Sequence, residues 1–391
     1  MEQILYLFNP DNELALADGG TDYLPPASAK KMEEDLSFLP VWWAEKDSFI
    51  LVSSIALAQR WQMKYIELIP SVKFTSFSLI PEFTQIKPWG WNCTLRKKLL
   101  KWGISINNLP SDKQLKEIRR LSNRATAVKC LLELNKISYT CGDSFICYTE
   151  EEIFSLLKKN KPFIMKAPWS GSGKGLRRGN GIDNISLSNW CKKILRNQGS
   201  MVIEPYYNKV QDFAMEFFLQ EDGSFLWLGY SLFRTDENGS YKSNLLMDNR
   251  RIEELLSNYV PEIDWCNFRD RLIKLLGKHL GTNYTGYIGV DMMVVCSKDE
   301  SKYYIHPCVE INLRMNMGIV SRLFYDRYVE FGSKGLFSVN YFSSSEKLNT
   351  WHEEQKEKKP LHIKGGRISS GYFSLVPVGK ETRYLVSVFI S

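Results

Sequence analysis

The sequence predicts an α/β protein whose C-terminal part has mixed α+β character. Two short apolar runs, ILYLF (4–8) and FILVSS (49–54), lie among segments of helical spacing, which indicates a small α/β unit over residues 1 to about 118. Later apolar runs are also short, and turn-forming stretches such as QEDGS and TDENGS separate them. That pattern is typical of strands joined by hairpin turns.

Helices are expected before these strands and among them along the chain. Residues 111–135 have a helical pattern with a break near Ser122-Asn123, where either side chain is a suitable cap for a second helix. Residues 263–281 read as an amphipathic helix. We expect a strand at ISYT (137–140), a solvated connector at the charged KLNTWHEEQKEKKP (347–360), and a closing hairpin around Gly379-Lys380.

Composition narrows the class of protein. A chain of 391 residues suggests two or three domains, and 44% hydrophobic residues are ample for packed cores. The net charge of +7 is spread over separate segments, so we expect no nucleic-acid partner. The eight cysteines form no C-x-x-C pair, the first residues lack a basic signal-peptide region, and FILVSSIALA is too short to span a bilayer. We therefore expect a cytoplasmic protein with no membrane partner.

A glycine-rich loop follows the apolar run PFIM. In KAPWSGSGKG (166–175), consecutive backbone N–H groups are suited to holding an anion such as phosphate. A P-loop is excluded because Pro168 stands where its first glycine belongs. The dinucleotide fingerprint is excluded because Gly175 comes one residue early. By itself the loop leaves two alternatives, a phosphate cradle or a flexible hairpin turn.

A second feature is the hairpin predicted over 288–313, with its turn in SKDES. The midpoint of positions 291 and 310 falls in that turn, so Asp291 and Glu310 are expected to face each other. Glu310, Asn312 and Arg314 alternate along one strand and therefore share a face. Facing carboxylates repel unless a cation lies between them, and oxygen ligands suit Mg²⁺. The alternative is an exposed polar face on an edge hairpin.

Taken in order, these features resemble the ATP-grasp superfamily of carboxylate ligases, which includes biotin carboxylase and D-alanine–D-alanine ligase. The resemblance covers about residues 120–320. It rests on a cation opening a helix, a strand lysine before a glycine loop, a strand-end glutamate, and an acid followed by E-x-N-x-R. It implies an N-terminal α/β pre-ATP-grasp domain (1–118) and an ATP-grasp domain (119–391). The latter would comprise a mobile lid subdomain (about 125–203) and a metal-binding C-terminal lobe (about 204–391).

The resemblance also implies roles for individual residues. Lys166 and Arg124 would contact the nucleotide phosphates, and the loop would close over them as a lid. Glu204 would lie beside the adenine amino group, Tyr206 and Tyr207 would line the base, and Asp212 would meet the ribose. Asp291, Glu310 and Asn312 would bind the metal, and Arg314 would act near the reacting acyl phosphate. The implied lid residues are Ser170, Gly171, Ser172, Gly173 and Lys174.

Three positions depart from the family pattern. Arg124 replaces a usual lysine, which keeps the charge but changes its geometry. Pro205 removes a hinge N–H, although contacts through carbonyl groups would survive. The first metal ligand, Asp291, is an aspartate where glutamate is usual. None of these departures removes a required charge.

The function implied is an ATP- and Mg²⁺-dependent ligase, with Mn²⁺ as an alternative metal. It would activate a carboxylate as an acyl phosphate for attack by an amine or a thiol. The substrate would be a small molecule or a peptide with a carboxylate, and a homodimer is left open. The alternatives are a small-molecule kinase on the same fold and a non-enzymatic ATP-binding sensor.

Three further segments keep two interpretations each. Asn9 in NPDNELALADGG either caps a helix or lies with ligand-binding groups at the end of the first strand. Trp89 and Trp91 either pack in a core or form a wall for the substrate. The stretch 230–244 is either a surface hairpin or an anion contact made by Arg234, Lys242 and Asn244.

Overall fold

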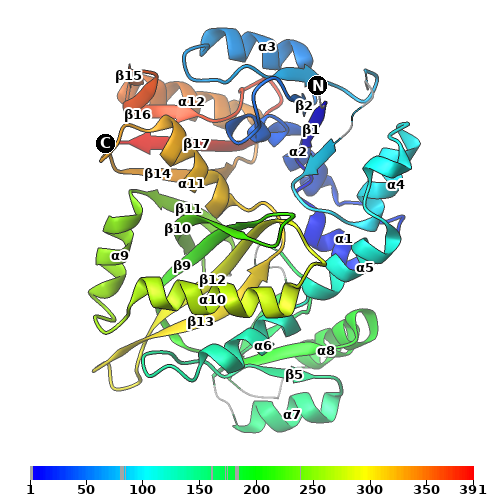
Figure 1. Ribbon diagram of the computed structural model, residues 1–391, viewed down its shortest axis with the longest axis vertical. Coiled ribbons are helices and arrows are strands. Elements are labelled where there is room, and N and C mark those ends of the chain that lie inside the picture. Colours follow the sequence, from blue (N-terminus) through cyan, green and yellow to red (C-terminus); the bar gives the residue numbers. More distant parts are fainter. Residues whose placement is uncertain are drawn as a thin grey trace.

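The computed structural model describes residues 3–391 except 80–82, 84, 160–161, 172, 174, 181–184 and 238. The described residues form three sheets (Figure 1). The N-terminal unit, blue to cyan, lies beside the orange and red C-terminal strands. These strands form the upper part of the large central sheet, the green and yellow strands of the same sheet lie below them, and a small sheet with its helices forms the lower end.

The N-terminal sheet is parallel and has the strand order β3-β2-β1-β4. Its central strand β1 is buried along its whole length, as the apolar run at residues 4–8 predicted. The strands are β1 (Ile4–Leu7), β2 (Phe49–Leu51), β3 (Lys73–Thr75) and β4 (Gln85–Pro88). The helices that belong with them are α1 (Asn12–Asp18), α2 (Ala27–Leu36), α3 (Ile55–Lys64), α4 (Cys93–Lys101) and α5 (Asp112–Leu121), with 3₁₀ turns η1 (Leu39–Trp42) and η2 (Ile106–Asn108).

The central sheet is antiparallel, with nine strands in the order β13-β12-β9-β10-β11-β14-β17-β16-β15. Its first strands are β9 (Asn208–Leu219), β10 (Phe225–Thr235), β11 (Tyr241–Leu246), β12 (Gly286–Cys296) and β13 (Tyr303–Asn312). The others are β14 (Gly335–Tyr341), β15 (His362–Lys364), β16 (Arg367–Ser374) and β17 (Tyr384–Ile390). The helices along this part of the chain are α6 (Arg124–Leu134), α9 (Asn249–Ser257), α10 (Trp265–Leu280), α11 (Met317–Tyr328) and α12 (Ser345–Lys358).

The two faces of this sheet differ in chemistry. On β9, Phe213, Met215 and Phe217 are fully buried in a core shared with α6 and α10. Because side chains alternate along a strand, Asp212 and Glu216 lie on the opposite face. The helix α11 contacts strands β9, β10 and β11. The alternation of side chains along the strand therefore gives the sheet one apolar face and one polar face.

The lower end of the molecule is an antiparallel sheet of order β5-β8-β6-β7 with its own small apolar core. Its strands are β5 (Phe145–Cys147), β6 (Phe163–Lys166), β7 (Leu176–Gly179) and β8 (Met201–Pro205), and its helices are α7 (Glu150–Lys159) and α8 (Ile185–Gln198). The glycine-rich loop joins β6 to β7. A separate core of this size suits a subdomain that moves as a unit.

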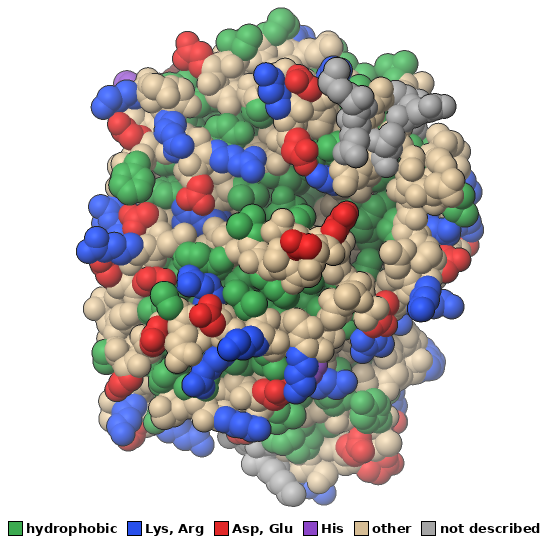
Figure 2. Space-filling model, in the orientation of Figure 1, with side chains coloured by type: hydrophobic (Ala, Val, Ile, Leu, Met, Phe, Trp, Pro, Cys, Tyr) green, Lys and Arg blue, Asp and Glu red, His purple; other side chains and the backbone are tan. Residues whose placement is uncertain are grey.

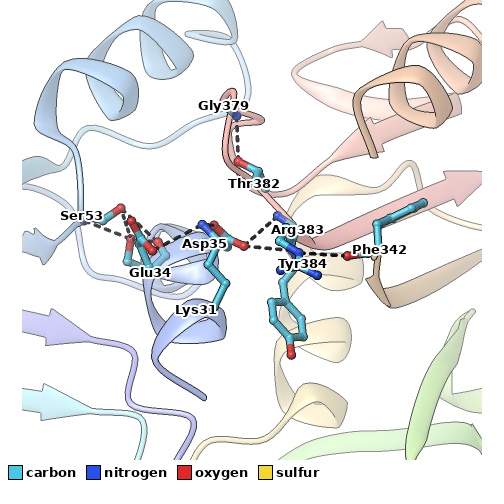
Figure 3. A network of polar contacts seen from close by, with 10 residues as sticks. Lys31, Glu34, Asp35, Ser53, Phe342, Gly379, Thr382, Arg383 and Tyr384 are labelled. Atoms are coloured by element: carbon cyan, nitrogen blue, oxygen red, sulfur yellow. Dashed lines mark hydrogen bonds and ion pairs between the residues drawn. The ribbon is translucent and has the colours of Figure 1, made fainter. Parts of the chain in front are cut away.

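The N-terminal unit is joined to the C-terminal strands by a common core that runs from Ile4 to Ile390. Polar contacts reinforce it (Figure 3): Asp35 of α2 accepts hydrogen bonds from the backbone N–H groups of Arg383 (2.8 Å) and Tyr384 (3.0 Å). Lys31 forms an ion pair with Asp35 at 2.8 Å. The last strands of the central sheet therefore pack against the N-terminal unit.

Most of the predicted elements are confirmed. The helical break is real, because α5 ends at Leu121 and Asn123 caps α6 by accepting from the N–H of Ala125. The strand predicted at 137–140 is wrong: this segment is a turn with one isolated bridge, and the Thr140 hydroxyl donates to the carbonyl of Leu134. That contact ties the segment to the end of α6 and leaves it too short to pair as a strand.

The charged segment 347–360 is also different from the prediction. It is not a connector, because most of it belongs to helix α12, whose first turn is capped by the hydroxyl of Ser344. Leu348 is fully buried and Trp351 packs against the N-terminal and C-terminal core. Two apolar residues among many charges are a weak periodic signal, so only their burial reveals the helix.

Candidate active site

A cavity of about 350 Å³ lies where the N-terminal unit, the central sheet and the lower sheet meet. Every predicted site residue that the structure describes lines this cavity. They are Arg124, Lys166, Ser170, Gly171, Gly173, Glu204, Tyr206, Tyr207, Asp212, Asp291, Glu310, Asn312 and Arg314. Ser172 and Lys174 lie outside the described residues. The structure thus brings together residues that are separated by almost two hundred positions in the chain; their roles stay predictions.

One end of the cavity holds a buried ion pair. Lys166 at the end of β6 and Glu204 on β8 lie on neighbouring strands, and their side chains approach to 2.6 Å. The hydroxyl of Ser144 donates to the second oxygen of Glu204 at 3.0 Å. Burial acts to raise the pKa of Glu204, but the charges of Lys166 and His306 and the hydrogen bonds from Lys166 and Ser144 together outweigh it, and the pKa lies below its usual value. Each charge here already has an opposite partner.

Two tyrosines follow Glu204 at the same end. Tyr207 accepts a hydrogen bond from the N–H of Asp143 at 2.6 Å, which fixes its ring. Tyr206 is partly exposed, and the guanidinium of Arg178 lies 4.8 Å from its ring centroid. Aromatic faces beside a buried ion pair provide a surface on which a flat ring can stack.

The glycine-rich loop is anchored through Arg124, the first residue of α6. The N–H of Arg124 donates to the carbonyl of Pro168 at 3.1 Å, and its side chain donates to the carbonyl of Ala167 and the hydroxyl of Ser170. Gly173 has φ of +73°, a conformation that favours glycine. The flexible-turn alternative therefore explains the backbone of the loop but not its attachment to a cationic residue in the cavity.

The carboxylate hairpin has the register that was predicted at its most important point. Asp291 on β12 pairs directly with Glu310 on β13. The ladder then shifts between Asp291 and Met293, so a bulge lies on the side toward the turn. The amide of Asn312 donates to Asp291 at 3.2 Å, and Arg314 donates to the oxygen of Asn312 at 3.1 Å. The predicted common face of these side chains is confirmed.

The two facing carboxylates are not equally compensated. Glu310 forms an ion pair with Arg124 at 2.9 Å. Among the described residues Asp291 has only the amide of Asn312, and its pKa is raised well above the usual value by burial and then by Glu310. The residues fit Mg²⁺, because two carboxylates and an amide are hard oxygen donors and an added cation would relieve their repulsion. Within the described ranges, no group of three or more His, Cys, Asp or Glu side chains is arranged to hold a metal. An ion here would need other oxygens, such as phosphates, to complete its shell.

Several cavity residues were missed by sequence reasoning. Glu13 of α1 forms an ion pair with Arg314, so the NPDNELALADGG segment does reach the cavity. Glu216 is buried and accepts hydrogen bonds from Ser231 (2.8 Å) and Asn316 (3.0 Å). Glu216 could have been found from its period-two spacing to Asp212, whereas nothing in the sequence pairs Glu13 with Arg314.

The structure shows where the residues lie in the three segments that the sequence left with two interpretations each. Asn9 does not cap α1; its side chain donates to the carbonyl of Gly90 at 2.8 Å and so joins the ends of β1 and β4. Trp89 is buried against Phe8 and also lines the cavity. Of the three candidate anion contacts in 230–244, Arg234 on β10 and Lys242 on β11 are exposed, and Asn244 on β11 lines the cavity.

Comparison with known proteins gives a result for the structure only. No protein-family model matches the sequence, and no curated protein matches it. The fold is similar to that of N5-carboxyaminoimidazole synthetase from Staphylococcus aureus complexed with ADP, with a TM-score of 0.53 and 12% identity over 100% of this chain and 94% of that one. It is also similar to a biotin carboxylase–β,γ-ATP complex from Campylobacter jejuni, with a TM-score of 0.54 and 12% identity over 100% and 88% of the two chains.

A third similar structure is the biotin carboxylase domain of Hydrogenobacter thermophilus 2-oxoglutarate carboxylase with MgADP, ADP and bicarbonate. Its TM-score is 0.52, with 10% identity over 100% of this chain and 86% of that one. The protein has the ATP-grasp fold. The α/β architecture expected from the sequence is thereby confirmed.

Two other findings bear on partners. In the part of the chain that the structure describes, no helix combines the length and the apolar character needed to cross a membrane. On the face shown in Figure 2, basic and acidic side chains are interspersed and do not form a stripe of one sign. This face therefore lacks the electrostatic footprint of a nucleic-acid binder.

Proposed function

We propose that the protein is an ATP- and Mg²⁺-dependent ligase, which activates a carboxylate as an acyl phosphate for attack by an amine or a thiol. The observation that carries the proposal is the direct pairing of Asp291 with Glu310, with Asn312 and Arg314 beside them. This group shares one cavity with Lys166 and the glycine-rich loop. The nucleotides named for the three similar structures support ATP as the cosubstrate.

In this proposal the cavity binds ATP along its length. The base lies near Glu204, Tyr206 and Tyr207, the ribose near Asp212, and the phosphates near Lys166, Arg124 and the loop residues. Mg²⁺ bound by Asp291, Glu310 and Asn312 supplies positive charge to the phosphates. Because the ion pair of Arg314 with Glu13 can be exchanged for one with an incoming anion, Arg314 is suited to neutralise charge on the transferred phosphoryl group.

The chemistry requires two displacements. A carboxylate oxygen attacks the γ-phosphorus and ADP leaves with the electron pair of the broken P–O bond. The acceptor, after losing a proton to water if it is an ammonium, attacks the acyl carbon, and phosphate leaves with the electrons of the C–O bond. A second nitrogen proton is lost as the amide forms. Closure of the loop would exclude water, which otherwise hydrolyses an acyl phosphate.

The test uses hydroxylamine, a small nucleophile that converts acyl phosphates to hydroxamates. The protein is incubated with ATP, Mg²⁺, hydroxylamine and pooled carboxylic acids, and the products are identified by their masses. A ligase yields a hydroxamate together with ADP and free phosphate. A kinase yields a stable phosphorylated product with ADP and no free phosphate, and a sensor yields neither. Either of the last two results would overturn the proposal.

A further inference from the structure

The cavity continues beyond the metal-binding group into a part that the proposed nucleotide site does not use. The register of the sheet defines its place. Asp212 lies on β9 toward the nucleotide end, whereas Ala214 is level with Asp291 and Glu216 is level with Gly289 and Asn312. Moving along β9 from the ribose position, one passes the metal ligands and then reaches Glu216. An acceptor approaching the acyl phosphate from the side opposite ADP would arrive here.

Glu216 is a buried carboxylate without a cationic partner among the described residues. Within the described part of the chain it accepts two hydrogen bonds, both from neutral groups, the hydroxyl of Ser231 and the amide of Asn316. It is 1% exposed and lines the cavity. Burying a charge without an opposite charge lowers the stability of the fold. A glutamine at this position would accept the same hydrogen bonds from Ser231 and Asn316 without lowering it.

Glycines leave room for this carboxylate. A Cβ atom at Gly289 would lie 2.6 Å from one oxygen of Glu216, and a Cβ at Gly318 would meet the other. On β10 the residue level with Glu216 is Gly229. A larger residue at Gly289 or Gly318 would therefore displace Glu216. This arrangement suits a functional group that is held in one orientation.

A second, independent feature lies nearby on β11. Asn244 is fully buried and lines the same cavity, and its amide nitrogen has no hydrogen-bond partner among the described residues. Its oxygen is occupied, because it accepts from the hydroxyl of Tyr241. Asn244 is on the same face of the sheet, paired through Phe233 to Asp212. An unpaired buried N–H₂ group in a cavity is suited to a ligand oxygen.

We propose that Glu216 and Asn244 form the acceptor subsite, in which Glu216 binds an ammonium group and Asn244 donates to a carboxylate or carbonyl oxygen of the same molecule. The acceptor is then a primary amine that carries an oxygen acceptor, as in an amino acid or an amino amide, and not a thiol. This inference rests on the proposed ligase function and narrows its second substrate.

The experiment compares two nucleophiles in the presence of ATP, Mg²⁺ and the carboxylic acid identified with hydroxylamine. Hydroxylamine is mostly uncharged near neutral pH, and ammonium chloride supplies a cation. In Glu216→Gln, kcat/KM for amide formation from ammonium should fall about 10- to 100-fold more than kcat/KM for hydroxamate formation. Glu253→Gln is the matched control, because Glu253 accepts a hydrogen bond from Tyr230 and does not line the cavity.

A second variant tests the oxygen contact. Asn244→Ala should raise KM for amino acids and amino amides more than KM for ammonium, since only the former carry the oxygen that Asn244 contacts. Circular dichroism shows whether each variant is folded. If Glu216→Gln is misfolded, Glu216→Asp replaces it in the test. Because Glu216→Asp keeps the charge, it should retain part of the ammonium reaction.

The outcomes separate the two proposals. If wild type forms no hydroxamate from any acid, the ligase proposal itself fails. If wild type forms hydroxamate but no amide from ammonium, amino acids or amino amides, the proposed acceptor subsite is wrong. Equal losses with hydroxylamine and ammonium in Glu216→Gln would show that Glu216 only supports Asn316 and helix α11, and would also overturn it.

Discussion

Two pairs of charged residues face the same cavity, and they are built in opposite ways. Lys166 and Glu204 form a closed ion pair, buried at one end of the cavity. Asp291 and Glu310 are like charges placed opposite each other on neighbouring strands, and among the described residues only Glu310 has a cationic partner, Arg124. The first pair is compensated by the chain itself. The second lacks a full set of cations, and in our proposal Mg²⁺ provides the missing charge.

This difference has a consequence for stability. Removing one partner from a closed buried pair leaves a charge without compensation, whereas removing the charge of Asp291, which has no cationic partner among the described residues, relieves repulsion. Loss of charge at Lys166 and at Asp291 should therefore change stability in opposite directions. The following predictions test that contrast.

The largest effect is expected at the closed pair. Lys166→Met leaves Glu204 buried without a cation, so the free energy of unfolding should fall by about 3–5 kcal/mol. The double variant Lys166→Met/Glu204→Gln should recover most of that loss. Urea denaturation measures both, with Lys242→Met as control, because Lys242 is exposed and pairs with Asp236 only at 3.6 Å.

The same variant tests the phosphate contact. Lys166→Met should weaken ATP binding more than adenosine binding, by about 1.5–3 kcal/mol, since only ATP carries the phosphates. Isothermal titration of both ligands gives the difference. Equal losses would mean that Lys166 serves only to compensate Glu204.

The facing carboxylates should give a smaller change of a different kind. Glu310→Gln keeps the size of the side chain, and the relief of repulsion with Asp291 opposes the loss of the ion pair with Arg124, so the protein should stay folded and bind nucleotide with a smaller change in stability than Lys166→Met. Turnover should fall at least ~100-fold, or about 2.7 kcal/mol in the barrier, because the charge that helps to hold the metal is lost. Phosphate release measures turnover, and Glu221→Gln in the exposed β9–β10 turn is the control. Near-normal phosphate release would require the ligase proposal to be abandoned.

The pH dependence of stability should also differ between the regions. Burial raises the pKa of Glu216 to about 7, so the folded state resists its ionisation and stability falls as pH rises toward that value. Asp291, with its raised pKa, acts in the same direction. Glu204, with its lowered pKa, contributes stability that is lost as pH falls.

The variant Glu216→Gln isolates one of these contributions. Between about pH 5 and about pH 7, wild type should lose about 2 kcal/mol of stability that the variant keeps. Denaturation curves at the two pH values measure it. If the free energy of unfolding changes equally between the two pH values in wild type and variant, Glu216 has an ordinary pKa in the folded state.

The smallest effect concerns the glycine-rich loop. The amides of Gly171 and Gly173 should exchange their hydrogens freely without ligand and become protected when ATP and Mg²⁺ are added. Glycines in distant turns, such as Gly223, serve as internal controls. Exchange that is insensitive to nucleotide would remove the lid from the proposal and leave the fold unaffected.

Several of these features were accessible from the sequence because they depend on local periodicity. The pairing of Asp291 with Glu310 follows from their position about the turn, and the shared face of Glu310, Asn312 and Arg314 follows from alternation. The same rule applied to Asp212 would have found Glu216. The rule failed at residues 137–140, where contacts with the end of α6 replace strand pairing, and at α12, where two buried residues define the helix.

The sequence by itself determined the strands, the hairpin and the glycine-rich loop, because their signals repeat over two to four residues. Only the tertiary structure decided how those pieces share charge. The contacts of Glu13 with Arg314, Arg124 with Glu310 and Asn316 with Glu216 each join elements far apart in the chain. Such contacts leave no periodic trace, since they depend on how the N-terminal unit and the sheets pack against one another. It is these contacts that leave Asp291 and Glu216 without a cationic partner among the described residues.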